Sequence, residues 1–275
     1  MKKLIIFLFV FLPILTLAND EDETELVKTI RTFYDGLDHS AMKTDYLFNR
    51  GFVILNDLEE WYNGSPIITN RGKWECILKC INESKITSSQ KDIINLDFPG
   101  DDNNTSTVNL SVLNYMGDYI SNDDVKKHLE DNTPVHYRPL TLFAGNVMQQ
   151  KVYSGNVQFE WDPACYFSNN KHKGLLYINF SDQQGFVPID ISRKQTINVE
   201  YDCIGEKSIC FKQIQGSDTL ISYSKINIKI LCGEMILKSA AIINSASAVN
   251  FSVNGLNYKY EVGVDNKLDK PVIIS

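Results

Sequence analysis

The histidines of this chain stand apart from one another and from any recognisable nucleophile. His39, His128, His136 and His172 each lie in a polar or turn-like stretch, a context that favours surface positions. The Gly-x-Ser-x-Gly turn that presents a catalytic serine is absent, and so are a phosphate-binding Walker loop and a paired-histidine zinc helix. We therefore predict no catalytic residue, no cofactor and no metal site in this chain.

Paired and clustered carboxylates do not indicate acid–base chemistry either. Glu59 and Glu60 are adjacent in the sequence, so their side chains diverge on a helix. The run 101–104 offers loop oxygens that suit calcium, but it lacks the spaced ligands and the terminal glutamate of a known calcium loop. Asp182 and Asp202 fall near predicted turns, where capping a turn is the simpler interpretation.

Cysteine is the remaining reactive side chain, and an exported chain would use it for disulfides. Sequence alone does not decide the pairing. Cys76 and Cys80 are four residues apart on a predicted helix, without a second pair at zinc-site spacing. Cys203 and Cys210 flank a predicted hairpin turn at Gly205 and could face each other across two strands. The six cysteines are Cys76, Cys80, Cys165, Cys203, Cys210 and Cys232.

Two adjacent aromatic residues, Trp61 and Tyr62, stand beside the turn residues Asn63-Gly64-Ser65. A ring next to a turn can stack on the face of a sugar. Trp61, Tyr62 and Asn63 therefore form the candidate ligand patch, with a glycan or a cell-surface protein as partner. The alternative is that the two rings pack in the core between helices.

The first 18 residues are typical of a signal peptide. Lys2 and Lys3 precede the apolar run 4–17, and Thr16-Leu17-Ala18 leads into an acidic segment. A membrane anchor is the alternative, but the run is shorter than the ~20 residues that a spanning helix needs. Cleavage would change the formal charge from −7 to −9 and disfavour binding to nucleic acid. We expect a secreted or periplasmic protein.

The rest of the chain predicts an α+β protein, with helices first and strands after them. In the helical and mixed region 19–138, Leu26, Ile30 and Phe33 recur at helical spacing, and the turn-rich run 97–106 is a candidate flexible connection. From Pro139 the pattern alternates with a period of two, as in Ser222 to Ile230. Frequent turns between such strands predict a mainly antiparallel β-sandwich over 139–232. A β extension over 233–275 follows. The strand candidates after Pro139 are 140–144, 147–153, 156–161, 174–180, 195–202, 207–213 and 219–231.

The stretch Tyr177–Phe186, followed by Ile197–Tyr201 and Gly205–Lys212, resembles a PKD-like, immunoglobulin-type module. The chain keeps Phe180 and Asp182 of that pattern but has Ser181 and Gln183-Gln184 before Gly185. The wider layout resembles the N-terminal part of long exported Bacteroidetes-type proteins, in which such a module precedes an α/β-hydrolase-like domain. The pieces that carry this likeness are Tyr46–Arg50, Asn63–Ser65, Trp74 with its helix, Ser111–Tyr115, Val152–Phe159 and Leu268–Ile274.

Two functions are compatible with these observations. The first is an exported, non-catalytic accessory or binding module for a glycan or a protein ligand. The second, implied by the resemblance, is the leading part of a secreted α/β-hydrolase-like enzyme whose catalytic domain is absent from this chain. The ending Lys270–Ser275 would then lead into the first strand of that domain.

Overall fold

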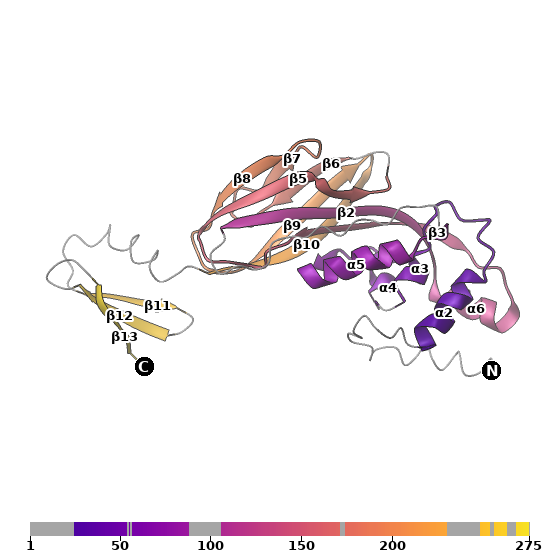
Figure 1. Cartoon of the computed structure of the whole chain (residues 1–275), viewed down its shortest axis with the longest axis horizontal. Helices are drawn as coiled ribbons and strands as arrows, with labels where there is room; N and C mark the ends of the chain where they lie inside the picture. Colours follow the sequence, from indigo (N-terminus) through magenta and orange to yellow (C-terminus); the bar gives the residue numbers. More distant parts are fainter. Residues whose placement is uncertain are drawn as a thin grey trace. The chain divides into compact units, whose positions relative to one another are not determined.

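The computed structural model describes residues 25–229, with gaps at 54, 56, 88–105 and 171–173, and the backbone of three later strands (Figure 1). The described residues form two compact units that divide at residue 230. The protein is mainly β-structured, as the alternating pattern predicts. The helices of the first unit are α2 (Glu25–Asp35), α3 (Phe48–Gly51), α4 (Leu58–Tyr62), α5 (Arg71–Glu83) and α6 (Asn122–Asp131).

Two sheets make up the body of the first unit. One has the strand order β3-β2-β5-β8, in which β2 and β5 are parallel and the other neighbours antiparallel. Its strands are β2 (Thr107–Ile120), β3 (Tyr137–Val147), β5 (Asn156–Ser168) and β8 (Gln195–Glu200).

The other sheet has the order β1-β10-β9-β6-β7, and β4 also pairs with β10. β1 and β4 run parallel to β10, whereas the remaining pairs are antiparallel. Its strands are β1 (Ile67–Thr69), β4 (Lys151–Val152), β6 (Leu175–Asn179), β7 (Phe186–Ile189), β9 (Gly205–Gln215) and β10 (Asp218–Ile228).

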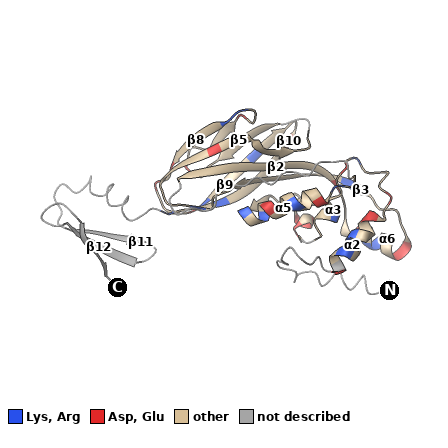
Figure 2. Ribbon diagram, viewed as in Figure 1, with Lys and Arg blue, Asp and Glu red and all other residues tan. Residues whose placement is uncertain are grey.

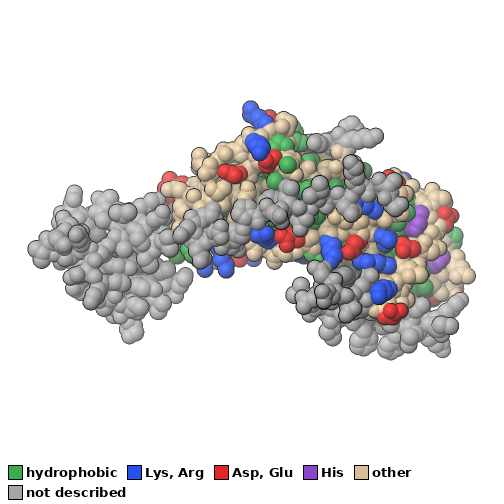
Figure 3. Space-filling view, viewed as in Figure 1, with side chains coloured by type: hydrophobic (Ala, Val, Ile, Leu, Met, Phe, Trp, Pro, Cys, Tyr) green, Lys and Arg blue, Asp and Glu red, His purple; other side chains and the backbone are tan. Residues whose placement is uncertain are grey.

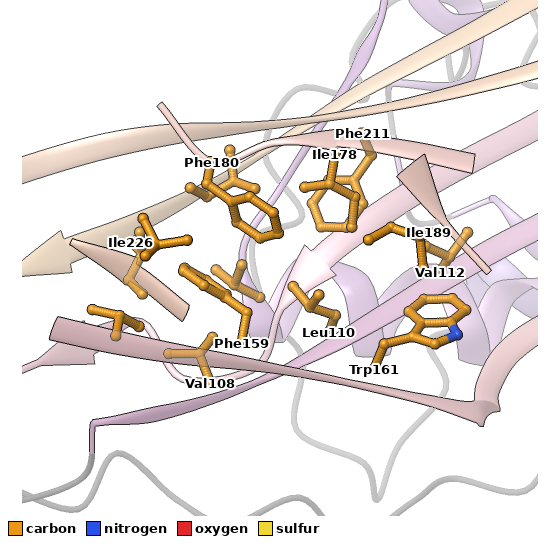
Figure 4. Packing of buried hydrophobic residues seen from close by; sticks show 14 of the residues in the cluster. Val108, Leu110, Val112, Phe159, Trp161, Ile178, Phe180, Ile189, Phe211 and Ile226 are labelled. Atoms are coloured by element: carbon orange, nitrogen blue, oxygen red, sulfur yellow. The ribbon is translucent and has the colours of Figure 1, made fainter. Parts of the chain in front are cut away.

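The hydrophobic core lies between these two sheets, because alternate residues of each strand point inward (Figure 4). Phe159 of the first sheet meets Phe180, which follows β6, with ring centroids 4.5 Å apart. Phe211 of β9 occupies the space beside Gly145 of β3, where an added Cβ would lie 2.1 Å from the ring. The two sheets therefore form a sandwich whose spacing is set by large, fully buried side chains.

Hydroxyl groups connect the sheets along one side of the sandwich. Ser222 Oγ of β10 accepts a hydrogen bond from the Gly145 backbone N–H at 2.8 Å, and Ser224 Oγ accepts from Val147 N–H at 3.2 Å. Thr69 Oγ1 of β1 donates to the Gly145 carbonyl at 2.6 Å. These bonds satisfy backbone groups on the edge of β3 that no neighbouring strand pairs, and they hold β10 against β3.

Helices cover the outer face of β2 and β3. α5 begins after Asn70, whose side chain accepts a hydrogen bond from Lys73 N–H, and its buried face includes Trp74. Phe48 of α3 lies over Gly117 of β2, where an added Cβ would approach the ring to 2.4 Å. A smaller cluster joins α2 and α6 to the end of β2.

The second unit has three antiparallel strands in the order β11-β12-β13. Lys270–Ile274, which the resemblance assigns to the start of a hydrolase sheet, lies in β13, antiparallel to β12. The strands are β11 (Ala248–Val253), β12 (Leu256–Val262) and β13 (Leu268–Ile274).

Two sequence expectations differ from the fold. The expected boundary at residue 139 falls inside β3, and β2, from the region predicted as helical and mixed, pairs with β3 over eleven residues (Leu110–Ile120). The sandwich therefore begins near Thr107. The hairpin predicted at Gly205 is wrong, because β8 and β9 belong to different sheets and β9 pairs with β6 and β10.

Candidate functional site

Part of one outer surface of the sandwich is apolar although no other described element covers it. On the sheet β1-β10-β9-β6-β7, outward side chains form three rows set by the strand register. We call these twelve residues the apolar face. They are Ile68, Tyr223, Cys210, Asn179 and Phe186 in the first row, Ile221, Lys212, Tyr177 and Pro188 in the second, and Thr219, Ile214 and Leu175 in the third.

Three members of the apolar face are large hydrophobic side chains with high exposure. Leu175 is 62% exposed, Ile68 is 54% exposed and Phe186 is 41% exposed. Ile68 lies at the β1 side, Phe186 at the β7 side and Leu175 in the third row, so exposed hydrophobic side chains border a half-buried middle of the face. Figure 3 shows one side of the molecule, on which hydrophobic side chains stand among polar ones over the sandwich.

The opposite sheet provides an internal comparison. Where β5 and β8 pair, the outward positions are all polar, as in the pair Glu160–Thr196. An antiparallel sheet with one solvated face normally shows that alternation. A sheet surface that only faces water would be polar, as the surface of β5 and β8 is in the same sandwich. The apolar face therefore needs another explanation.

Lys212 is the one charged member of the apolar face. Its Nζ lies 4.0 Å from the ring centroid of Phe186 and 5.1 Å from that of Tyr177. Among the described residues it has no carboxylate partner, whereas nearby Lys225 pairs with Glu206 at 2.8 Å. The face thus presents an ammonium group framed by aromatic rings and open to an anion. Figure 2 shows charged residues on the helices and also at several places in the sandwich.

The predicted ligand patch is not formed as expected. Trp61 is only 6% exposed and packs edge-on against Phe52 in the helical core. Tyr62 stacks on Tyr119 of β2 with ring centroids 4.5 Å apart, and only Asn63 is exposed. The expectation of a sugar-stacking Trp61 is therefore wrong, and core packing, the alternative considered from sequence, explains both rings.

The structure places His39 beside Tyr137, away from the apolar face. His39 Nδ1 lies 3.1 Å from the Tyr137 hydroxyl, which donates to the Asp38 carbonyl at 3.0 Å, so Nδ1 is the donor to the phenol oxygen. Burial, with the carboxylates of Asp38 and Asp118, raises the pKa of Tyr137 to about 12. Asp118 Oδ2 accepts from the backbone N–H groups of Lys43 and Thr44 at 3.0 and 2.7 Å. This cluster fastens residues 38–44 to the sandwich.

The described cysteines are all free thiols. Cys203 and Cys210 do not face each other: Cys210 lies opposite Tyr223 and Asn179 within the apolar face. Cys76 and Cys80 are neighbours on α5, and a hydrogen bond from Cys80 lowers the pKa of the Cys76 thiol to about 7. Cys232 lies outside the described residues.

The remaining candidates carry no assembled site in the described part of the chain. His128 lies on α6, where Nδ1 is 2.8 Å from the Thr133 carbonyl oxygen, and His136 is exposed to solvent. Asp182 Oδ1 accepts from Gln184 N–H, as expected for a turn. His172, the run 101–104 and the predicted signal peptide lie outside the described residues. Among those described, no three metal-ligating side chains come together.

Comparison of the chain with protein-family models, with curated proteins and with solved structures finds no match. No helix in the described ranges has the length and apolarity to cross a bilayer. The candidate site thus rests on the geometry of the apolar face. A sequence signal for it exists: Leu175-Leu176-Tyr177-Ile178 has large apolar residues on both faces of β6, where a solvated strand would alternate.

Proposed function

We propose that the protein is an exported, non-catalytic binding module that holds a protein ligand on the apolar face. The observation that carries the proposal is the contrast between the two outer sheet surfaces, one wholly polar where β5 and β8 pair and one largely apolar. Exposed apolar patches of a few hundred Å² are often functional on monomeric proteins. Export is supported by the pattern of residues 1–18, which favours a secreted or periplasmic location.

The strand order supports the immunoglobulin-like part of the interpretation. In variable-type immunoglobulin domains one sheet has the order G-F-C-C′ and the other pairs strands B and E. Here β10-β9-β6-β7 reproduces the first order, and β5 with β8 reproduces the second pair. In this interpretation, which includes the PKD-like resemblance, β2, β3 and the helices are additions to the module.

The size of the apolar face is compatible with a protein as the ligand. With strands about 4.8 Å apart and outward residues about 6.8 Å apart along each strand, the flat footprint of its twelve residues is roughly 400 Å². A standard interface buries about 800 Å² on each partner, with an apolar core and a polar rim. The face therefore has the size of an interface core, and polar neighbours such as Ser208 and Lys225 supply the start of a rim.

Charge distinguishes a different protein from a second copy. A symmetric dimer whose two-fold axis passes near the middle of the face would bring two copies of Lys212 together within an apolar interface, at an electrostatic cost that no carboxylate among the twelve residues of the face offsets. A partner whose apolar surface includes one carboxylate would instead pair with Lys212. The ligand class that fits is thus a protein surface with an acidic residue among apolar ones.

Binding measurements with the purified mature chain test this proposal. Panels of extracellular proteins and of glycans serve as probes, and sedimentation reports self-association. We expect binding to a protein that Ile221→Glu or Lys212→Glu weakens at least ~30-fold, the effect of losing a contact worth about 2 kcal/mol. Thr196→Glu on the polar surface of β8 is the matched control and should bind as the wild type does. Equal binding by all variants, binding to glycans alone or dimerisation through this face would overturn the proposal.

A further inference from the structure

The sequence contains seven Asn-x-Ser/Thr tripeptides, the acceptor motif for N-linked glycans. The motif alone has little weight, because its asparagine must also be accessible and conformationally suitable. Side chains are described for four of the seven, so their surroundings can be compared. The asparagines are Asn63, Asn82, Asn103, Asn104, Asn109, Asn179 and Asn250.

Asn179, in the tripeptide Asn179-Phe180-Ser181, has the geometry of an acceptor. It is the last residue of β6, and its Oδ1 accepts a hydrogen bond from the Ser181 N–H at 2.8 Å. That bond forms a turn and commits Oδ1 to the backbone, which leaves the amide nitrogen Nδ2 directed elsewhere. Ser181 is exposed and has φ 62°, so the acceptor hydroxyl lies on a surface turn.

The neighbours of Asn179 form a platform for a sugar ring. Tyr177 is two residues earlier on the same strand and therefore on the same face of the sheet. Phe186 is directly opposite Asn179 in β7. A pyranose ring attached to Nδ2 could pack on these rings as aromatic side chains pack on other apolar surfaces.

Three other tripeptides lack this combination. Asn82 lies within α5, and its acceptor Ser84 is fully buried with its hydroxyl on the Cys80 carbonyl. Asn109 lies within β2, and Ser111 is fully buried. Asn63 is exposed in a turn, but Trp61 is buried and the half-buried Tyr62 is stacked on Tyr119, so its aromatic neighbours are engaged in packing.

We infer that Asn179 is an N-glycosylation site whose first sugar covers the β6–β7 side of the apolar face. The donor would be an oligosaccharide on a lipid diphosphate, met during export. Nδ2 of Asn179 forms a bond to the anomeric carbon, the bond from that carbon to the diphosphate oxygen breaks, and Nδ2 loses one proton to a base of the transferase. That sugar would also lie over Lys212, whose Nζ is 4.0 Å from the Phe186 ring centroid and 5.1 Å from that of Tyr177, so the glycosylated chain would keep only Ile68 and Ile221 at the other side of the face open to the ligand.

This inference rests on the proposed export, so the experiment separates the two. The full chain is secreted from eukaryotic cells, once with its own leader and once with a heterologous signal peptide, and mass spectrometry of peptides maps the glycans. Failure of the native leader alone would contradict export and leave the acceptor site measurable with the heterologous leader. An unmodified Asn179 in the chain secreted with that leader would overturn the inference.

Variants of the tripeptide and of Tyr177 test the acceptor site and the packing of the sugar separately. Asn179→Gln and Ser181→Ala should each remove the glycan at this position, whereas Ser111→Ala, the matched change at a buried tripeptide, should leave the glycan pattern unchanged. Enzymatic removal of the glycan should lower Tm by about 2–4 °C in the wild type and by less in Tyr177→Ala. An equal loss of Tm in both proteins would show that the sugar does not pack on Tyr177.

Discussion

Replacing Gly145 with alanine tests how the two sheets pack. A Cβ at this position would lie 2.1 Å from the Phe211 ring, which is fully buried, so the ring cannot turn into solvent. Overpacking of this kind costs about 1–3 kcal/mol, and the intrinsic advantage of alanine over glycine in a strand returns about 0.5–1 kcal/mol. Because the contact is far inside van der Waals distance, we expect a net loss of about 2 kcal/mol.

Thermal unfolding measures this loss. For a domain of this size about 2 kcal/mol lowers Tm by roughly 4–8 °C. Gly72→Ala on α5 is the control, since the nearest atom to its added Cβ is 3.8 Å away, and it should leave Tm unchanged or higher. Phe211→Leu should cost less in the Gly145→Ala protein than in the wild type. If Gly145→Ala behaves like Gly72→Ala, Phe211 does not occupy that space and the described packing of the sheets is wrong.

Three further predictions concern the helical side of the molecule. Trp61→Ala should lower the free energy of unfolding by about 3–5 kcal/mol in urea titrations, as expected for a core residue; an undetectable loss would favour the surface interpretation. Asp118→Ala leaves the backbone N–H groups of Lys43 and Thr44 without their acceptor and should cost about 2–4 kcal/mol, with faster hydrogen exchange of Thr44; native-like exchange would refute this anchoring role. The rate of Cys76 alkylation should rise with pH through a midpoint near 7, because the thiolate is the reacting form. Cys80→Ala removes the hydrogen-bond donor to Cys76 and should raise that midpoint, whereas Cys80→Ser keeps a donor and should not.

The alternating pattern predicts the strands that have one solvent-exposed face, but it does not predict the strands that lack one. β10 alternates in Ser222–Ile228 because one side faces the core and the other the surface, and this alternation predicts the strand. Only the start of β2 shows that pattern. From Leu113 to Ile120 its residues are nearly all buried, since the core lies on one side and helices on the other, so alternation disappears. β7 is short and contains Pro188, so it was missed.

Pairing and exposure are the parts of the site that sequence could not predict. Alternation identifies a strand but not its neighbour, which is why the sequence predicts a hairpin turn at Gly205 although β8 and β9 lie in different sheets. Likewise, Trp61 and Phe186 are both large aromatic residues close to a turn, yet the first is in the core and the second is on the surface. Only the register across five strands brings the residues of the apolar face together.

Site-specific photo-crosslinking tests the central claim, that the apolar face binds a protein ligand. A photoreactive amino acid is placed at Ile221 in one protein and at Thr196 in another, and each is applied to intact cells. The account predicts that position 221 cross-links to one discrete protein, through a peptide in which an acidic residue lies among apolar ones, and that position 196 gives no such product. Absence of a product at position 221, or the same products at both positions, would contradict it.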